Sequence, residues 1–105
     1  MLRTREYTKN EITKINLISE DPKFHAELMV LLEEFRQGST VKNYLADAIK
    51  EDLPLHKATS VTWLVYELCN AFNDHEIEAD YLSEVVVDVE DLVEEIIDLI
   101  EKYKK

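Results

Sequence analysis

Residues 82–103 read LSEVVVDVEDLVEEIIDLIEKY, and the spacing of their apolar side chains decides the fold. Apolar residues recur at alternating intervals of three and four, with a third apolar position in each two-turn repeat. This pattern predicts a helix that lies on a core along a stripe about three positions wide in seven. The stripe consists of Leu82, Val85, Val86, Val89, Leu92, Val93, Ile96, Leu99, Ile100 and Tyr103. Most of the remaining surface is acidic, with Glu84, Asp88, Glu90, Asp91, Glu94, Glu95, Asp98 and Glu101.

The beginning of this helix has two interpretations. Residues 85–87 are all valine and favour a strand by local propensity. Asp88, with Asp91 three residues later, also fits a cap at which a helix restarts. Because the apolar spacing runs unbroken through Val85, we predict one helix from about Ala79, with a restart at Asp88 as the second choice.

The first two helices are marked by caps. Thr8 and Glu11 form a capping box, and Tyr7 with Ile12 fits a hydrophobic staple, so a helix begins here and ends near Ser19. A second helix begins at residues 21–22, where aspartate caps and proline takes the first helical position. Its predicted inner face consists of Phe24, Leu28, Leu31, Leu32 and Phe35.

Two further helices follow. Gly38 predicts the end of the second helix in a left-handed cap, and Ser39 or Thr40 caps a third that closes before Pro54. Residues 58–73 carry apolar side chains on nearly all faces, and Glu67 is their only charged residue. A helix that is apolar all round is a buried helix, so we predict that this segment is the centre of the bundle.

The fold predicted from these segments is all-α. The chain of 105 residues is the size of one domain, and its single glycine and two prolines leave few turn residues for an all-β fold. We therefore predict one helical domain over residues 1–105, a bundle of about five helices with residues 1–7 as a flexible arm. The apolar residues at the edge of the last helix, Ile97, Val87 and Tyr81, leave a homodimer open beside a monomer.

The expected location is the cytoplasm. No apolar run approaches the roughly 20 residues that a membrane span needs, and the beginning of the chain lacks the apolar core of a signal peptide. The single cysteine, Cys69, excludes an intramolecular disulfide and a cysteine-rich zinc site. We expect no membrane partner, no metal, no cofactor and no catalytic residue.

The charge is strongly one-sided. The chain carries a net charge of −11, and residues 58–101 contain no lysine or arginine at all. Such a surface opposes direct binding to nucleic acid, because phosphate contacts need positive charge. It suits a non-enzymatic binding protein whose acidic last helix engages a basic, nucleic-acid-binding surface of a partner protein, as a DNA mimic does. The predicted partner-binding residues are Asp91, Glu94, Glu95, Asp98 and Glu101. The alternative interpretation is that this acidic face is only solvated and binds no partner.

Two comparisons follow from composition and motif. In size and charge the chain resembles phage-encoded inhibitors of host nucleases and restriction systems, which implies an inhibitor or regulator. Residues 94–99, EEIIDL, resemble the second metal-binding segment of the all-α, MazG-like nucleotide pyrophosphatases. That resemblance implies a magnesium-dependent enzyme using Asp91, Glu95 and Asp98. The family also needs two acids three apart on an earlier helix, and Glu67 stands alone on the apolar helix of residues 58–73.

A third hypothesis is a helix-turn-helix regulator. The second and third predicted helices are joined by a short link at residues 37–39, as that motif requires. Lys42, Asn43 and Lys50 lie on the helix that would enter the DNA. The net negative charge and the length of the leading helix count against this hypothesis.

Overall fold

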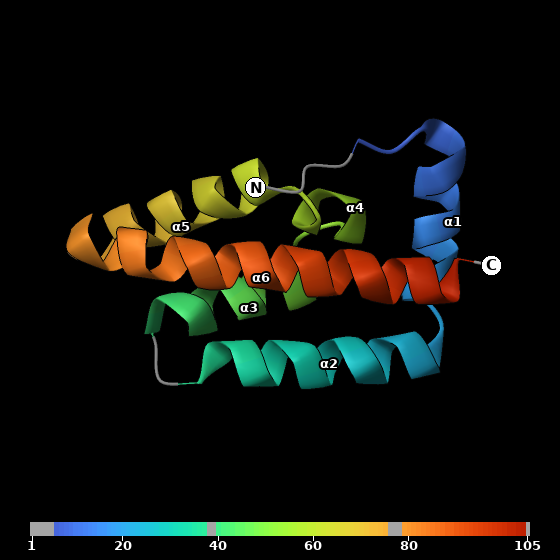
Figure 1. Ribbon diagram of the computed structural model, residues 1–105, viewed down its shortest axis with the longest axis horizontal. Helices are drawn as coiled ribbons and strands as arrows, with labels where there is room; N and C mark the ends of the chain where they lie inside the picture. Colours follow the sequence, from blue (N-terminus) through green and yellow to red (C-terminus); the bar gives the residue numbers. More distant parts are fainter. Residues whose placement is uncertain (1–5, 38–39, 76–78, 105) are drawn as a thin grey trace.

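The structure, a computed structural model, describes residues 6–37, 40–75 and 79–104; the side chains of residues 71, 72, 74, 75 and 79–84 lie outside that description. Over these ranges the chain forms six helices and no strand, so the all-α prediction is confirmed (Figure 1). The helices are α1 (Lys9–Ser19), α2 (Pro22–Arg36), α3 (Thr40–Glu51), α4 (Leu55–Ala58), α5 (Val61–His75) and α6 (Ala79–Tyr103). The prediction of about five missed α4, a single turn that follows Pro54.

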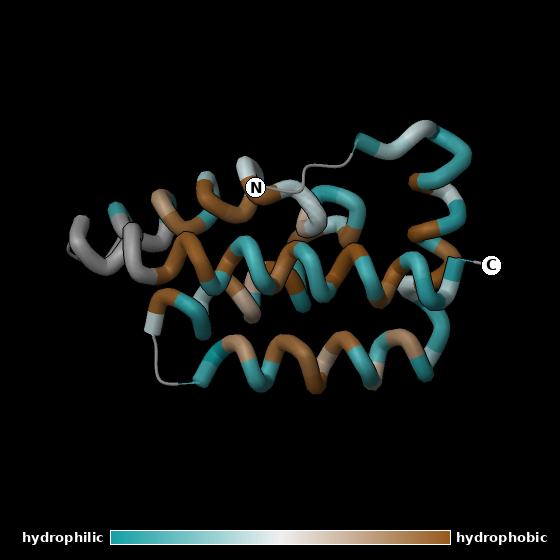
Figure 2. The backbone as a smooth tube through the Cα atoms, in the orientation of Figure 1, coloured by the Kyte–Doolittle hydropathy of each residue, from teal (hydrophilic) through white to brown (hydrophobic). Residues whose placement is uncertain are grey.

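Helix α6 is the axis of the fold. It is one unbroken helix of 25 residues from Ala79, so the restart at Asp88 is wrong and tertiary packing overrides the strand propensity of the valines. It packs against α1, α2 and α5, and Figure 1 shows it crossing the whole molecule between α5 and α2. Its buried side chains are Val85, Val89, Leu92, Val93, Ile96, Ile97 and Ile100. Figure 2 shows the resulting alternation of apolar and polar residues along it.

The buried face of α6 is wider than the predicted stripe. Ile97 was placed outside the stripe, yet its side chain is fully buried. The reason is that helices pack against α6 from more than one side, so a broader arc of its surface is covered. Ile97 is therefore part of the core and is not available at the surface for a dimer, whereas Val87 is 60% exposed.

Helix α5 is not the centre of the bundle, contrary to the sequence-based prediction. Among its described side chains only Val61, Leu64 and Leu68 are buried, and Tyr66 is 55% exposed. The helix also begins at Val61, because Ala58 belongs to α4. Aromatic side chains with a polar end tolerate partial exposure, so an apolar composition alone overstated the burial of this segment.

The predicted caps are present where the structure describes them. The Glu11 amide donates to Thr8 Oγ1 at 3.2 Å and the Thr8 amide donates to Glu11 Oε1 at 3.3 Å, which completes the capping box. The Lys23 amide donates to Asp21 Oδ1 at 2.8 Å at the beginning of α2. The caps predicted at residues 38 and 39, and residues 1–5 of the predicted arm, lie outside the described residues. Tyr7 packs against the core.

No helix in the described ranges combines the length and the apolarity that crossing a membrane would require. The described helices instead enclose one core, which residues from α1 to α6 share.

Candidate functional site

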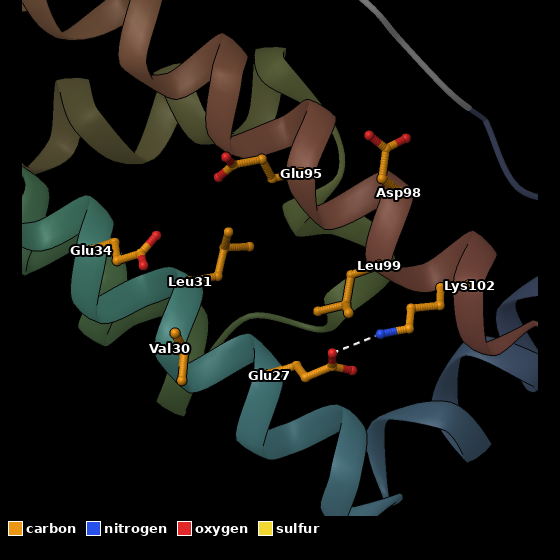
Figure 3. A pocket seen from close by; sticks show the side chains of 8 residues that line it. All are labelled: Glu27, Val30, Leu31, Glu34, Glu95, Asp98, Leu99 and Lys102. Atoms are coloured by element: carbon orange, nitrogen blue, oxygen red, sulfur yellow. Dashed lines mark hydrogen bonds and ion pairs between the residues drawn. The ribbon is translucent and has the colours of Figure 1, made fainter.

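The candidate site is a groove between α2 and α6. The two helices run side by side in opposite directions along the molecule (Figure 1). The hollow between them has a volume of about 450 Å³. We call it the acidic groove; it is lined by Glu27, Val30, Leu31, Glu34, Glu95, Asp98, Leu99 and Lys102 (Figure 3).

Both helices contribute to the groove with the same spacing. The lining residues of α2 are 27, 30, 31 and 34, and those of α6 are 95, 98, 99 and 102. Positions i, i+3, i+4 and i+7 lie on one face of a helix, so each helix turns a continuous strip toward the groove. On α2 the strip has glutamate at both ends and apolar residues in the middle, whereas the strip on α6 ends in lysine.

The floor of the groove is apolar and open. Figure 3 shows Leu31 and Leu99 between the two helices, with Val30 on α2 beside them. Val30 is 60% exposed, and Leu31 and Leu99 are half-buried at the edge of the core. A partner that covered these side chains would remove apolar surface from water, which favours binding.

One end of the groove collects carboxylates. Glu34 on α2 and Glu95 on α6 stand on opposite sides of the hollow at this end (Figure 3). The pKa of Glu95 is raised above its ordinary value, first by partial burial and then by the negative charges of Glu34, Asp91 and Asp98. When these carboxylates are ionised, they lie close enough for their negative charges to repel one another.

The groove continues beyond this end into a second hollow of about 210 Å³. The second hollow shares Leu31, Glu34 and Glu95 with the first and adds Asp91 and Asp88 from α6. The two hollows together make one furrow along α2 and α6, with acids at its middle.

An ion pair with a lysine closes each end of this furrow. At one end, Lys102 Nζ lies 2.7 Å from Glu27 Oε1, and the Tyr103 hydroxyl donates a hydrogen bond to Glu27 Oε2. At the other end, Lys42 Nζ of α3 lies 2.5 Å from Asp88 Oδ2 and 5.5 Å from the centre of the Phe35 ring. The lysines thus neutralise the ends of the furrow, while the acids in its middle include Glu34, Asp91 and Glu95.

The predicted partner-binding residues divide into two groups. Asp91, Glu95 and Asp98 line the furrow, although the Asp98 carboxylate points away from α2 in Figure 3. Glu94 and Glu101 line neither hollow, and Glu101 Oε1 lies 3.9 Å from Lys104 Nζ. All five lie on α6, and all except the half-buried Glu94 are exposed.

The sequence reasoning missed the contribution of α2. Helix α2 supplies half of the lining residues of the groove, with Glu27 and Glu34 seven residues apart and the exposed Val30 between them. The signal available in the sequence was the strip at positions 27, 30, 31 and 34. This strip becomes part of a groove only because α2 packs beside α6, and no local sequence pattern specifies that packing.

The structure also bears on the two alternative hypotheses, a magnesium-dependent enzyme and a helix-turn-helix regulator. Within the described residues, no three histidine, cysteine or acidic side chains come together as a metal site would need. Lys42, placed by the helix-turn-helix hypothesis on a DNA-facing surface, is paired with Asp88, and its side chain is only 18% exposed. Lys50 lines a separate pocket at the other end of α3.

Comparison with known proteins gives no relative. No protein-family model, no curated protein and no solved structure matches this chain.

Proposed function

We propose that this protein is a non-enzymatic binding protein whose acidic groove takes a basic segment of a partner protein. The observation that carries the proposal is the combination of an exposed apolar floor with Glu34, Asp91 and Glu95 beside it. Inhibition or regulation of a nucleic-acid-binding protein, by occupying its basic surface, is the form of binding that the charge favours.

The groove selects the occupant by charge and shape. A furrow between two helices suits an amphipathic segment that lays apolar residues on the floor. Lysine or arginine at the flanks of that segment would meet Glu34 and Glu95. The net charge of −11 would attract such a segment over a Debye length of roughly 8 Å in physiological salt.

The electrostatics of Glu95 support the same occupant. Its pKa is raised first by partial burial and then by the repulsion of the negative charges of Glu34, Asp91 and Asp98. A bound cation would relieve that repulsion and lower the pKa of Glu95. Binding of a basic segment would therefore strengthen as the pH rises and Glu95 becomes ionised.

The test uses a peptide with lysine and leucine at helical spacing, labelled with a fluorophore. A groove variant carries Glu34→Gln, Asp91→Asn and Glu95→Gln. A matched control carries Glu20→Gln, Glu51→Gln and Asp52→Asn, three exposed acids outside the furrow. Both variants change the net charge by the same amount.

We expect the groove variant to weaken binding about tenfold and the control to weaken it much less. A rise in salt should weaken binding to the parent protein and to the control. Equal weakening in the two variants would mean that the peptide responds to total charge, and the groove proposal would then be wrong.

A further inference from the structure

A separate pocket lies on the other side of α2 from the acidic groove. It is formed where α1, α2, α3 and the segment leading into α4 meet, and its volume is about 270 Å³. Its walls belong to the core, since Phe24, Leu32, Ile49 and Leu55 line it and are all buried. The pocket shares no lining residue with the acidic groove.

The polar residues of this pocket form a chemically distinct group. They are Asn16, Ser19, His25 and Lys50. The Ser19 hydroxyl donates to the Asn16 carbonyl at 2.7 Å, so the serine is already satisfied, while the Asn16 amide and the two basic side chains can donate to a ligand. Each of these donors suits an anionic acceptor.

The charge of the pocket is opposite to that of the protein. The chain has 23 acidic residues against 12 lysines and arginines, yet none of the described lining residues is acidic. Within the described part of the chain, neither Lys50 nor the His25 side chain makes an ion pair. A pocket with apolar walls and a lysine at its rim is complementary to a small molecule with a hydrocarbon body and one negative group.

We propose that this pocket binds a small aliphatic carboxylate. The hydrocarbon chain would lie against Phe24, Leu32 and Ile49, and the carboxylate would sit between Lys50 and His25 at the rim. The volume is slightly below the range of roughly 300–1,000 Å³ found for drug-sized ligands, which points to a short chain.

Met29 makes the test direct. It lines the pocket, and the chain has only two methionines, so isotope-labelled methionine methyl groups give two NMR signals. Octanoate is the probe, and octanol is the uncharged control of similar length. We expect octanoate to shift the Met29 signal in a saturable way and to bind more tightly than octanol.

The length of the ligand tests the apolar walls. Along a series from butanoate to octanoate, each added methylene should raise the affinity by roughly threefold to fourfold until the pocket is full. A series with no dependence on length would contradict burial of the chain in this pocket.

A charge reversal tests the rim. Lys50→Glu should weaken octanoate binding roughly tenfold and leave octanol binding unchanged. The matched control is Lys14→Glu, an exposed lysine of α1 that does not line the pocket, which should change neither. Because Lys50 lies in the last turn of α3, thermal unfolding of both variants checks that the fold is intact.

The octanoate experiments test this pocket independently of the basic peptide proposed for the acidic groove. Failure of octanoate to shift Met29, or equal binding of octanoate and octanol with no effect of Lys50→Glu, would overturn the proposal. Neither result bears on the basic peptide, because the two sites share no residue.

Discussion

The Tyr103 hydroxyl donates a hydrogen bond to Glu27 Oε2, across 76 positions of sequence, and so fastens the last turn of α6 to α2. The Tyr103 ring also meets Phe24 edge-on, with ring centres 5.4 Å apart. Lys102 Nζ, from the same turn, lies 2.7 Å from the other oxygen of Glu27. One carboxylate therefore anchors both polar groups at the closed end of the acidic groove.

We predict that Tyr103 titrates near pH 12. The hydrogen bond to Glu27, then burial, raises the pKa of Tyr103 to about 12 from an ordinary value of about 10. The stability that this proton contributes is complete below the ordinary value and is lost as the pH rises through the raised one. Ultraviolet absorbance should show one late-titrating tyrosine fewer in Tyr103→Phe than in the parent protein. A titration of the variant that keeps every late-titrating tyrosine of the parent would contradict the hydrogen bond.

Glu27→Gln should lower the free energy of unfolding at neutral pH. The pKa of Glu27 is lowered, first by the hydrogen bond from Lys102 and then by that from Tyr103. The stabilisation is present above the ordinary pKa and is lost as the pH falls through the lowered one. Urea unfolding of the variant and the parent should therefore converge in strong acid. A difference that stays constant with pH would show that the effect is not that of the ionised carboxylate.

Glu95→Gln should have the opposite effect. The raised pKa of Glu95 means that its ionised form destabilises the folded state, fully above the raised pKa and not at all below the ordinary one. We expect the variant to be slightly more stable than the parent at pH 7, by at most about 0.5 kcal/mol for this exposed site, and equal to it in acid. Glu51→Gln, at an exposed acid outside the groove, removes one negative charge as well and is the matched control. An equal gain in stability in the two variants at pH 7 would contradict an effect specific to the groove.

The ion pair between Lys42 and Asp88 should show measurable coupling. Their charged atoms lie 2.5 Å apart, and the Lys42 side chain is only 18% exposed. A double-mutant cycle with Lys42→Met and Asp88→Asn should give a coupling energy of about 0.5–1 kcal/mol that decreases in high salt. Additive effects of the two substitutions would mean that the pair does not hold α3 to α6.

The core position of Ile97 gives a large predicted effect. Because its side chain is fully buried, Ile97→Ala should lower the free energy of unfolding by about 2–5 kcal/mol. Val87→Ala, on the same helix at a 60% exposed site, should change it by no more than about 0.5 kcal/mol. Denaturant unfolding measures both, and similar costs at the two positions would contradict this assignment of the core face.

The sequence specified the local features of this fold well. The caps at Thr8 and Asp21 and the single helix from Ala79 follow from short-range spacing, and all are confirmed. The depth of burial did not follow from short-range spacing. The burial of Ile97 and of the side chains of α5 depends on how many other helices pack against each helix. Composition made α5 look central, although its aromatic residues lie partly at the surface.

The candidate site was only half visible in the sequence. The acids of α6 were identified from their own spacing, whereas Glu27 and Glu34 become part of a site only through the packing of α2 beside α6. Pairing of helices so distant in sequence is a tertiary choice. An exposed valine between two glutamates is common on a solvated helix, so the strip on α2 does not by itself indicate a binding site.

The antiparallel arrangement of the two strips gives the acidic groove a polarity. Glu27 faces Lys102 at one end, while Glu34 and Glu95 stand across from each other at the opposite end (Figure 3). A bound peptide with a positive residue at one terminus would therefore meet different charges at the two ends of the groove. Only one of its two possible orientations would place that residue between Glu34 and Glu95. Such a groove would distinguish a peptide from the same residues written backwards, which makes chain direction part of its specificity.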